Sequence, residues 1–197
     1  MAKKPGAKSI IKREEVALTG IFLAFILAVG VLERMIPLDF IVPGARLGFS
    51  NVVVLVSIYI FRFRISLILV LLKCLLTSAL AGGPSSLIYS LSGSLLSFVV
   101  MYILVKALDE RISPIGVSVA GAAAHSTGQI IASCLVLESI GMFAYLPVLL
   151  VLSVISGVLV GFIVKNTVPR LRVIMPKLQR DDDKQRAGGS QRSNRRG

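Results

Sequence analysis

The sequence predicts an all-α integral membrane protein with six transmembrane helices and both termini in the cytoplasm. Three observations carry this prediction: the composition, six apolar stretches and the placement of Lys and Arg. Of the 197 residues, 55% are hydrophobic and 16% are charged, whereas charged residues make up about a quarter of a soluble domain. A water-soluble enzyme is therefore excluded.

The apolar stretches are long enough to be membrane helices, since a bilayer core of about 30 Å needs roughly 20 helical residues. We expect spans at 16–33, 47–60, 65–80, 86–106, 115–137 and 145–165. The second is the shortest, and we expect it to begin below the outer surface. These spans form one domain, 16–165, between a basic cytoplasmic tail, 1–15, and a basic, largely disordered cytoplasmic tail, 166–197.

The cations fix the orientation. Nineteen of the 22 Lys and Arg residues lie in the N-terminal tail, in the connections 61–64 and 106–114, or in the C-terminal part of the chain from Lys165 onward. The other connections carry only Arg34 and Arg46, so the positive-inside rule places them outside the cell and both termini inside. A multi-pass protein of the cell membrane follows. The net charge of +12 suits contacts with anionic membrane lipids, and no nucleic-acid partner is expected.

Polar residues inside apolar spans are costly, so they usually face a cavity or a partner. Lys73 lies near the middle of the third span, and His125 and Gln129 lie one turn apart on one face of the fifth. Ser90 lies in the outer half of the fourth span. With residues at the outer helix ends, these predict an outward-facing polar chamber. The candidate substrate-binding residues are Glu33, Arg46, Asn51, Lys73, Ser90, His125, Gln129 and Glu138.

Each candidate also has a purely structural interpretation. Lys73 could form a buried ion pair with Glu33 or Glu138, and both carboxylates could instead be solvated at helix ends. His125 and Ser90 could simply pack between helices. Arg46 could line the chamber or bind a lipid phosphate. The loop from Met35 to Ala45, rich in Pro and Gly, would close over the chamber.

Two helices carry small residues at four-residue spacing, which permits close helix approach. Gly20, Ala24 and Ala28 follow one face of the first span, and Ser153, Gly157 and Gly161 one face of the sixth. Such faces are usually internal packing surfaces. The first could equally dock a partner helix.

Motifs for catalysis are missing from the sequence. It has no phosphate-binding glycine loop with Lys and Ser/Thr, no nucleophile elbow and no metal-ligand cluster. Cys74 and Cys134 fall inside apolar spans, where a thiol behaves as a small hydrophobe. We therefore expect no cofactor, no metal and no enzymatic activity of this chain alone.

Three segments carry a resemblance to a known family. They are Leu32-Glu33 with Ile36-Pro37, the run Pro43 to Asn51, and the run Gly116 to Gln129. Together the segments resemble a bacterial family known both as Gx transporters and as heptaprenyl diphosphate synthase component I. Ser126 departs from the family pattern, in which Asn is usual, so no role is carried over to it.

This family is similar to the substrate-binding S components of energy-coupling-factor transporters. The resemblance implies a six-helix bundle with an outward pocket, powered by separate ATPases through a coupling transmembrane subunit. In S components a small-residue face of the first helix contacts that subunit, and Gly20, Ala24 and Ala28 stand at that place.

Two functions remain open at this point. The first is capture of a small anionic ligand for import. The second is a non-catalytic membrane component of heptaprenyl or polyprenyl diphosphate synthesis, partnered by a soluble prenyl synthase. A solitary channel or carrier is a third possibility, which a pore through the inner half would support.

Overall fold

The computed structural model describes residues 7–34, 48–81, 84–108 and 111–174, and within these ranges the chain is helical, with turns and no strand. The helices are α1 (Ala7–Arg34), α2 (Asn51–Ile60), α3 (Phe63–Ala81), α4 (Pro84–Leu108), α5 (Pro114–Val136), the short 3-10 helix η2 (Ile140–Tyr145) and α6 (Leu146–Ile174). The predicted all-helical class is confirmed.

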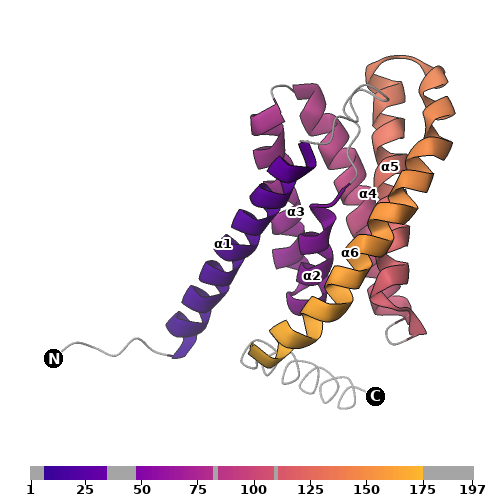
Figure 1. Ribbon diagram of the computed structural model, residues 1–197. Coiled ribbons are helices and arrows are strands. Elements are labelled where there is room, and N and C mark those ends of the chain that lie inside the picture. The colour runs from indigo at the N-terminus through magenta and orange to yellow at the C-terminus, as the bar shows by residue number, and fades with distance from the viewer. Residues whose placement is uncertain (1–6, 35–47, 82–83, 109–110, 175–197) are drawn as a thin grey trace, which may run out of the picture.

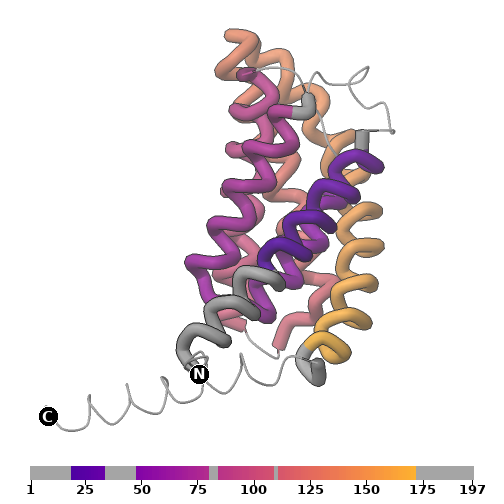
Figure 2. Tube along the Cα trace, turned by 90° about the vertical axis from the view of Figure 1, so that its left-hand side faces the viewer, coloured from indigo at the N-terminus to yellow at the C-terminus, as the bar shows by residue number. Residues whose placement is uncertain are grey.

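The six α-helices alternate in direction, so α1 begins and α6 ends at the same end of the bundle (Figure 1). The side view in Figure 2 shows the same alternation. The short helix α2 contacts each of the other five α-helices, which makes it the centre of the bundle. Any side chain near the start of α2 can therefore meet residues from several helices.

Two helices extend beyond the predicted spans by nine residues each, and one helix is four residues shorter than its span. α1 already begins at Ala7, inside the predicted tail 1–15, and α6 continues through Ile174, inside the predicted tail 166–197. Polar residues can continue a helix past the apolar stretch, so the length of a span does not set the length of its helix. α2 begins at Asn51 instead of 47, because Gly48 adopts a φ of 76° and ends the helical geometry there.

Ser113 and Pro114 fix the start of α5. The Ser113 side chain accepts a hydrogen bond from the Gly116 N–H at 3.2 Å, and Pro114 occupies the first helical turn. This is the usual N-terminal arrangement, in which a hydroxyl satisfies a free backbone donor and Pro gives up none.

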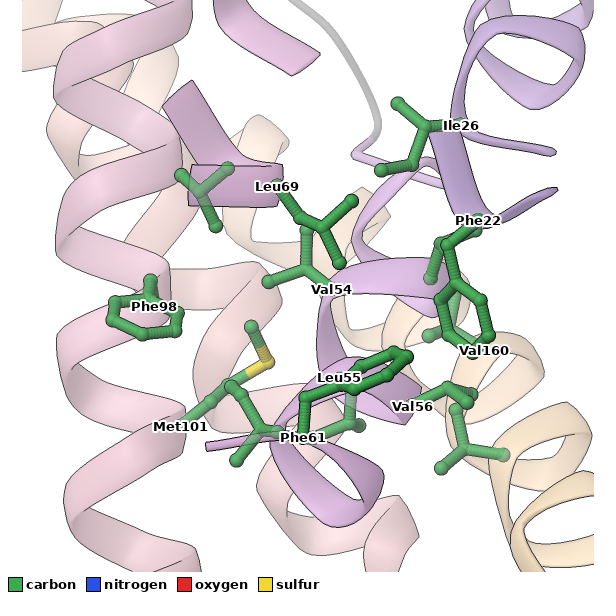
Figure 3. Close-up of a cluster of buried hydrophobic side chains, with 14 of the residues drawn as sticks. Phe22, Ile26, Val54, Leu55, Val56, Phe61, Leu69, Phe98, Met101 and Val160 are labelled. Atoms are coloured by element: carbon green, nitrogen blue, oxygen red, sulfur yellow. The ribbon is translucent and has the colours of Figure 1, made fainter. Parts of the chain in front are cut away.

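The hydrophobic core lies around α2 (Figure 3). Val54 and Leu55 of α2 are fully buried, as are Ile26 of α1 and Phe98 of α4. The rings of Phe22 and Phe61 meet edge to face with centroids 5.1 Å apart, which joins α1 to the end of α2. Such packing holds helices together even where the surroundings are as apolar as the core.

The outside of the bundle is apolar as well. Phe25 on α1 and Phe162 on α6 are 62% and 60% exposed, and other large hydrophobic residues accompany them on α3, α4 and α5. Exposed apolar surface this extensive is typical of lipid-facing helices. By length and composition, three stretches of the described chain could cross a membrane: Pro84–Leu108, Pro114–Val136 and Ile140–Leu171. The chain is a membrane-type helical protein.

Candidate functional site

The turn that precedes α2 is held by a carboxylate from α1. Glu33, 7% exposed at the end of α1, accepts hydrogen bonds from the backbone N–H groups of Gly48 and Ser50. The first N–H groups of a helix lack internal partners, and a carboxylate there also meets the positive end of the helix dipole. Ser50 makes no side-chain cap of its own. Glu33 therefore stabilises the start of α2.

A lysine from α3 reaches the first residue of the same helix. Lys73 Nζ donates to Asn51 Oδ1 at 2.5 Å, and both side chains are at least 96% buried. A buried ammonium needs an acceptor of this kind, because burying a charge without a partner is strongly unfavourable. The contact joins α2 to α3 across 22 residues of sequence.

His125 and Gln129 lie against two glycines. A Cβ atom at Gly93 of α4 would lie 2.9 Å from His125 Nδ1 and 2.8 Å from Gln129 Cγ. A Cβ atom at Gly48 would lie 3.2 Å from His125 Cδ2. The imidazole of α5 is thus bordered by α4 on one side and by the turn before α2 on the other. Both side chains are buried.

Hydroxyl groups continue the cluster between α3 and α4. Thr77 Oγ1 lies 3.5 Å from Ser90 Oγ and donates to the backbone carbonyl of Lys73 at 2.8 Å. The Cys74 thiol donates to the Ser90 carbonyl at 3.4 Å. One turn further along α4, Ser94 Oγ is buried and makes no hydrogen bond within the described residues. Each of the helices from α1 to α5 therefore contributes buried polar groups.

The charge of this cluster is small. Among the described residues, Lys73 is the one buried cation and Glu33 the one buried carboxylate. No group of three or more His, Cys, Asp or Glu residues that could hold a metal ion occurs in the described chain. The arrangement suits hydrogen bonding to a polar ligand, and the Lys73 ammonium could help to hold an anionic group.

The structure brings six of the eight predicted site residues together. These are Glu33, Asn51, Lys73, Ser90, His125 and Gln129, all buried. Glu138 instead lies exposed beyond the end of α5, with a φ of 49°. Arg46 and the predicted closing loop from Met35 to Ala45 lie outside the described residues.

The sequence also placed the polar residues Thr77 and Ser94 in the outer halves of their spans, and the structure finds both in the cluster. Sequence reasoning missed Gly48 and Gly93 as neighbours of the cluster. Gly48 lies in the run from Pro43 to Asn51, three residues before the predicted site residue Asn51. This closeness in sequence could have identified Gly48 as part of the site. Nothing in the sequence singles out Gly93, because its contact with His125 and Gln129 depends on how α4 packs against α5.

The two small-residue faces have different surroundings. On α6, a Cβ atom at Gly157 would lie 2.7 Å from Val119 Cα, and one at Gly161 would collide with Ile115 Cα. Ser153 Oγ lies 2.5 Å from Ser126 Oγ. The face of α6 is thus an internal contact with α5, and Ser126 takes part in it.

On α1 the corresponding face is open. A Cβ atom at Gly20 would have nothing within 4 Å, and Ala24 and Ala28 are exposed. The buried residues of α1 lie on its other side, at Phe22, Ile26 and Glu33.

Comparison with known families gives a match over residues 22–167 to heptaprenyl diphosphate synthase component I. The chain belongs to this family. The match spans α2 to α5 completely, the C-terminal part of α1 from residue 22 and most of α6, so it includes every residue of the polar cluster. Neither the curated proteins nor the solved structures gave a match.

Proposed function

We propose that this protein is the membrane-embedded substrate-binding subunit of an energy-coupling-factor type importer, which captures a small anionic ligand from the outer side. The observation that carries the proposal is the buried polar cluster built from α1, α2, α3, α4 and α5 around Lys73. Polar and charged groups gathered at one place in an otherwise apolar bundle mark a binding site in membrane proteins.

The proposed orientation places all six α-helices across the cell membrane with both termini in the cytoplasm. The connections after α2 and α4 lie at the end of the bundle where α1 begins (Figure 1). They carry the exposed cations Arg62, Arg64 and Arg111, as the positive-inside rule expects of a cytoplasmic face. These cations would contact anionic lipid headgroups. The polar cluster, at the opposite end of α1 and the start of α2, would then face outward.

In the proposed site, Lys73 binds the anionic group of the ligand. Asn51, Ser90, His125 and Gln129 would hydrogen-bond its polar part, and Arg46 would add a second cation. Glu33 has two backbone partners, so its part is to position the turn before α2. Glu138, exposed beyond α5, would contact the ligand only at the entrance.

The open face of α1 is the proposed docking site for the coupling transmembrane subunit, which would join this chain to ATPases. Gly20, Ala24 and Ala28 leave room for another helix to approach closely. The apolar residues Ile21 and Phe25 beside them are exposed and would add contact area.

The test is ligand uptake by cells that carry the Lys73→Met variant. Met has nearly the volume of Lys without its charge, so the helix packing should persist while high-affinity uptake is lost. Lys165→Met, at an exposed position of α6, is the matched control and should take up ligand normally. Unchanged uptake by the Lys73 variant would remove this assignment.

A second function is favoured by the family description. As a component of heptaprenyl diphosphate synthesis, the bundle would anchor a soluble prenyl synthase at the membrane or receive its lipid product, without catalysing the reaction. Its cytoplasmic face would then be the functional surface, and the polar cluster would be structural.

Affinity purification of the full chain from membranes separates the two functions. Co-purification of ATPases with a transmembrane coupling subunit supports import. Co-purification of a prenyl synthase supports the second function.

A further inference from the structure

The connection between α5 and α6 is apolar and exposed. The 3-10 helix η2 joins these helices at the end of the bundle opposite the end of α6 (Figure 1), and none of its residues is buried. Ile140 is 84% exposed, and Phe143 and Tyr145 are exposed as well. Exposed apolar surface of this kind marks a contact with another molecule or with a membrane.

The backbone turns sharply at the end of α5. Glu138 adopts a φ of 49°, and the Ser139 N–H donates to the Cys134 carbonyl at 3.2 Å. A left-handed residue followed by this hydrogen bond ends a helix and directs the chain away from the helix axis. As a result, η2 contacts both α5 and α6 instead of extending outward from the bundle.

The length of α6 places η2 at the edge of the hydrocarbon core. By composition, the membrane-crossing stretch Ile140–Leu171 already includes η2. The first cation of α6 is Lys165, which is exposed. The helix from Leu146 to Lys165 is about 29 Å long, close to the thickness of a bilayer core of about 30 Å. With Lys165 at one surface of that core, Leu146 and η2 lie at the other.

The three sides of η2 differ. Side chains three residues apart in a 3-10 helix lie above one another. Ile140 and Phe143 therefore share one side, and the small residues Gly141 and Ala144 share a second. The third side carries Met142, which packs against the bundle. One large apolar side and one small side are thus left without a neighbour among the described helices.

The lipid-facing surface reaches η2 from both directions along the chain. Leu135, near the end of α5, is 75% exposed, and Val148, near the start of α6, is exposed too. Glu138 is the one Asp, Glu, Lys or Arg in the sequence from 112 to 164. An apolar surface that continues into η2 with so little charge fits acyl chains better than water.

We propose that η2 is an interfacial membrane anchor, which lies along the bilayer surface with Ile140 and Phe143 inserted among the acyl chains of that leaflet. Tyr145 lies at the level of the headgroups, where amphipathic rings are enriched, and the side of Gly141 and Ala144 faces water. In the orientation proposed above, this leaflet is the outer one. The anchor requires only that α6 spans the bilayer, so it holds for either proposed function.

Such an anchor fixes the depth of α5 and α6 in the membrane. His125 and Gln129 lie on α5, one and two turns before the exposed end of that helix. The depth of this part of the polar cluster is therefore set by the contact of η2 with lipid.

The experiment uses single Trp residues as fluorescent probes, because the chain contains no Trp. Ile140→Trp and Phe143→Trp report on the proposed lipid side, and Ala144→Trp is the matched control on the water side. All three positions are exposed, so the fold should be preserved, which circular dichroism checks. Two probes on the lipid side keep the test decisive if one variant fails to fold.

The purified full chain is placed in nanodiscs of phosphatidylcholine with ordinary or brominated acyl chains. Brominated lipid should lower the emission of Ile140→Trp and Phe143→Trp about twofold, because an interfacial element buries its apolar side roughly 5–10 Å below the headgroup boundary. The emission of Ala144→Trp should stay nearly unchanged. Iodide dissolved in the water should give the opposite order and quench Ala144→Trp most.

Three results would overturn the proposal. Quenching of the two lipid-side probes by iodide but not by brominated lipid would place η2 in water. Equal quenching of Ile140→Trp and Ala144→Trp by brominated lipid would show that η2 has no preferred side. Protection of Ile140→Trp from both quenchers would show that protein, such as a second copy of the chain, covers η2 instead of lipid.

Discussion

The small-residue faces of α1 and α6 look alike in the sequence and differ in the structure. Gly157 and Gly161 of α6 lie against the backbone of α5, while Gly20 of α1 has open space around it. Spacing alone therefore shows where a helix can be approached closely, but not whether the chain itself supplies the neighbour. An unfilled face on an otherwise packed helix is what a partner subunit would require.

The largest effect is expected from Gly161→Ala. Because the added Cβ collides with Ile115 Cα, α5 and α6 must move apart, and overpacking of this kind costs about 2–3 kcal/mol. The unfolding midpoint measured by circular dichroism in detergent should fall by about 6 °C. A midpoint equal to that of the wild type would show that the two helices are not in this close contact.

The next largest effect is on partner binding and is expected from Ala24→Leu. A bulky side chain on the open face of α1 should block a closely approaching helix and weaken co-purification of the coupling subunit about tenfold, or ~1.4 kcal/mol. The unfolding midpoint of the isolated chain should stay unchanged, because Ala24 is exposed. Ala107→Leu, the same change at an exposed position of α4, is the matched control. Undiminished co-purification would remove the docking assignment.

A smaller loss of stability is expected from Ser126→Ala, which leaves Ser153 without its cross-helix hydroxyl partner. The cost should be about 1 kcal/mol, the usual value of one such hydrogen bond. It stays moderate because Ser153 also donates to the Leu149 carbonyl at 2.7 Å. The double variant with Ser153→Ala should be less destabilised than the sum of the single variants, and strict additivity would mean that the two hydroxyls do not interact.

The smallest effect, and one of opposite sign, is expected from Gly20→Ala. With nothing within 4 Å of the new Cβ, the substitution gains helix propensity and should stabilise the isolated chain by about 0.5 kcal/mol. The same chemical change thus stabilises one face and destabilises the other. A loss of stability at position 20 would mean that the face of α1 is covered within the bundle.

Much of the fold was predictable because it depends on local patterns. The apolar stretches predict where the six α-helices lie along the chain, and Ser113-Pro114 marks the residue at which α5 begins. The four-residue spacing of His125 and Gln129 put both on one face of α5, and the structure confirms that they share Gly93 as a neighbour. The depth of Lys73 in its span identified it as a residue that needs a partner.

The partners themselves were not predictable. The sequence offered Glu33 and Glu138 as ion-pair partners for Lys73, but it gave no sign of the hydrogen bond to Asn51, 22 residues away along the chain. Glu33 proved to bind the backbone of the turn before α2, since that turn leaves N–H groups without helical acceptors. Such contacts depend on where helix ends meet in space, and residue type alone does not encode this.

The sequence by itself determined that the chain is helical and membrane-type, where its helices lie and which residues would be costly to leave without polar partners. These properties follow from hydropathy and helical periodicity, which act over a few residues. Only the tertiary structure decided that five helix segments share one polar cluster, that the face of α6 is filled and that the face of α1 is open. The reason is that each of these depends on which distant helix occupies the neighbouring space.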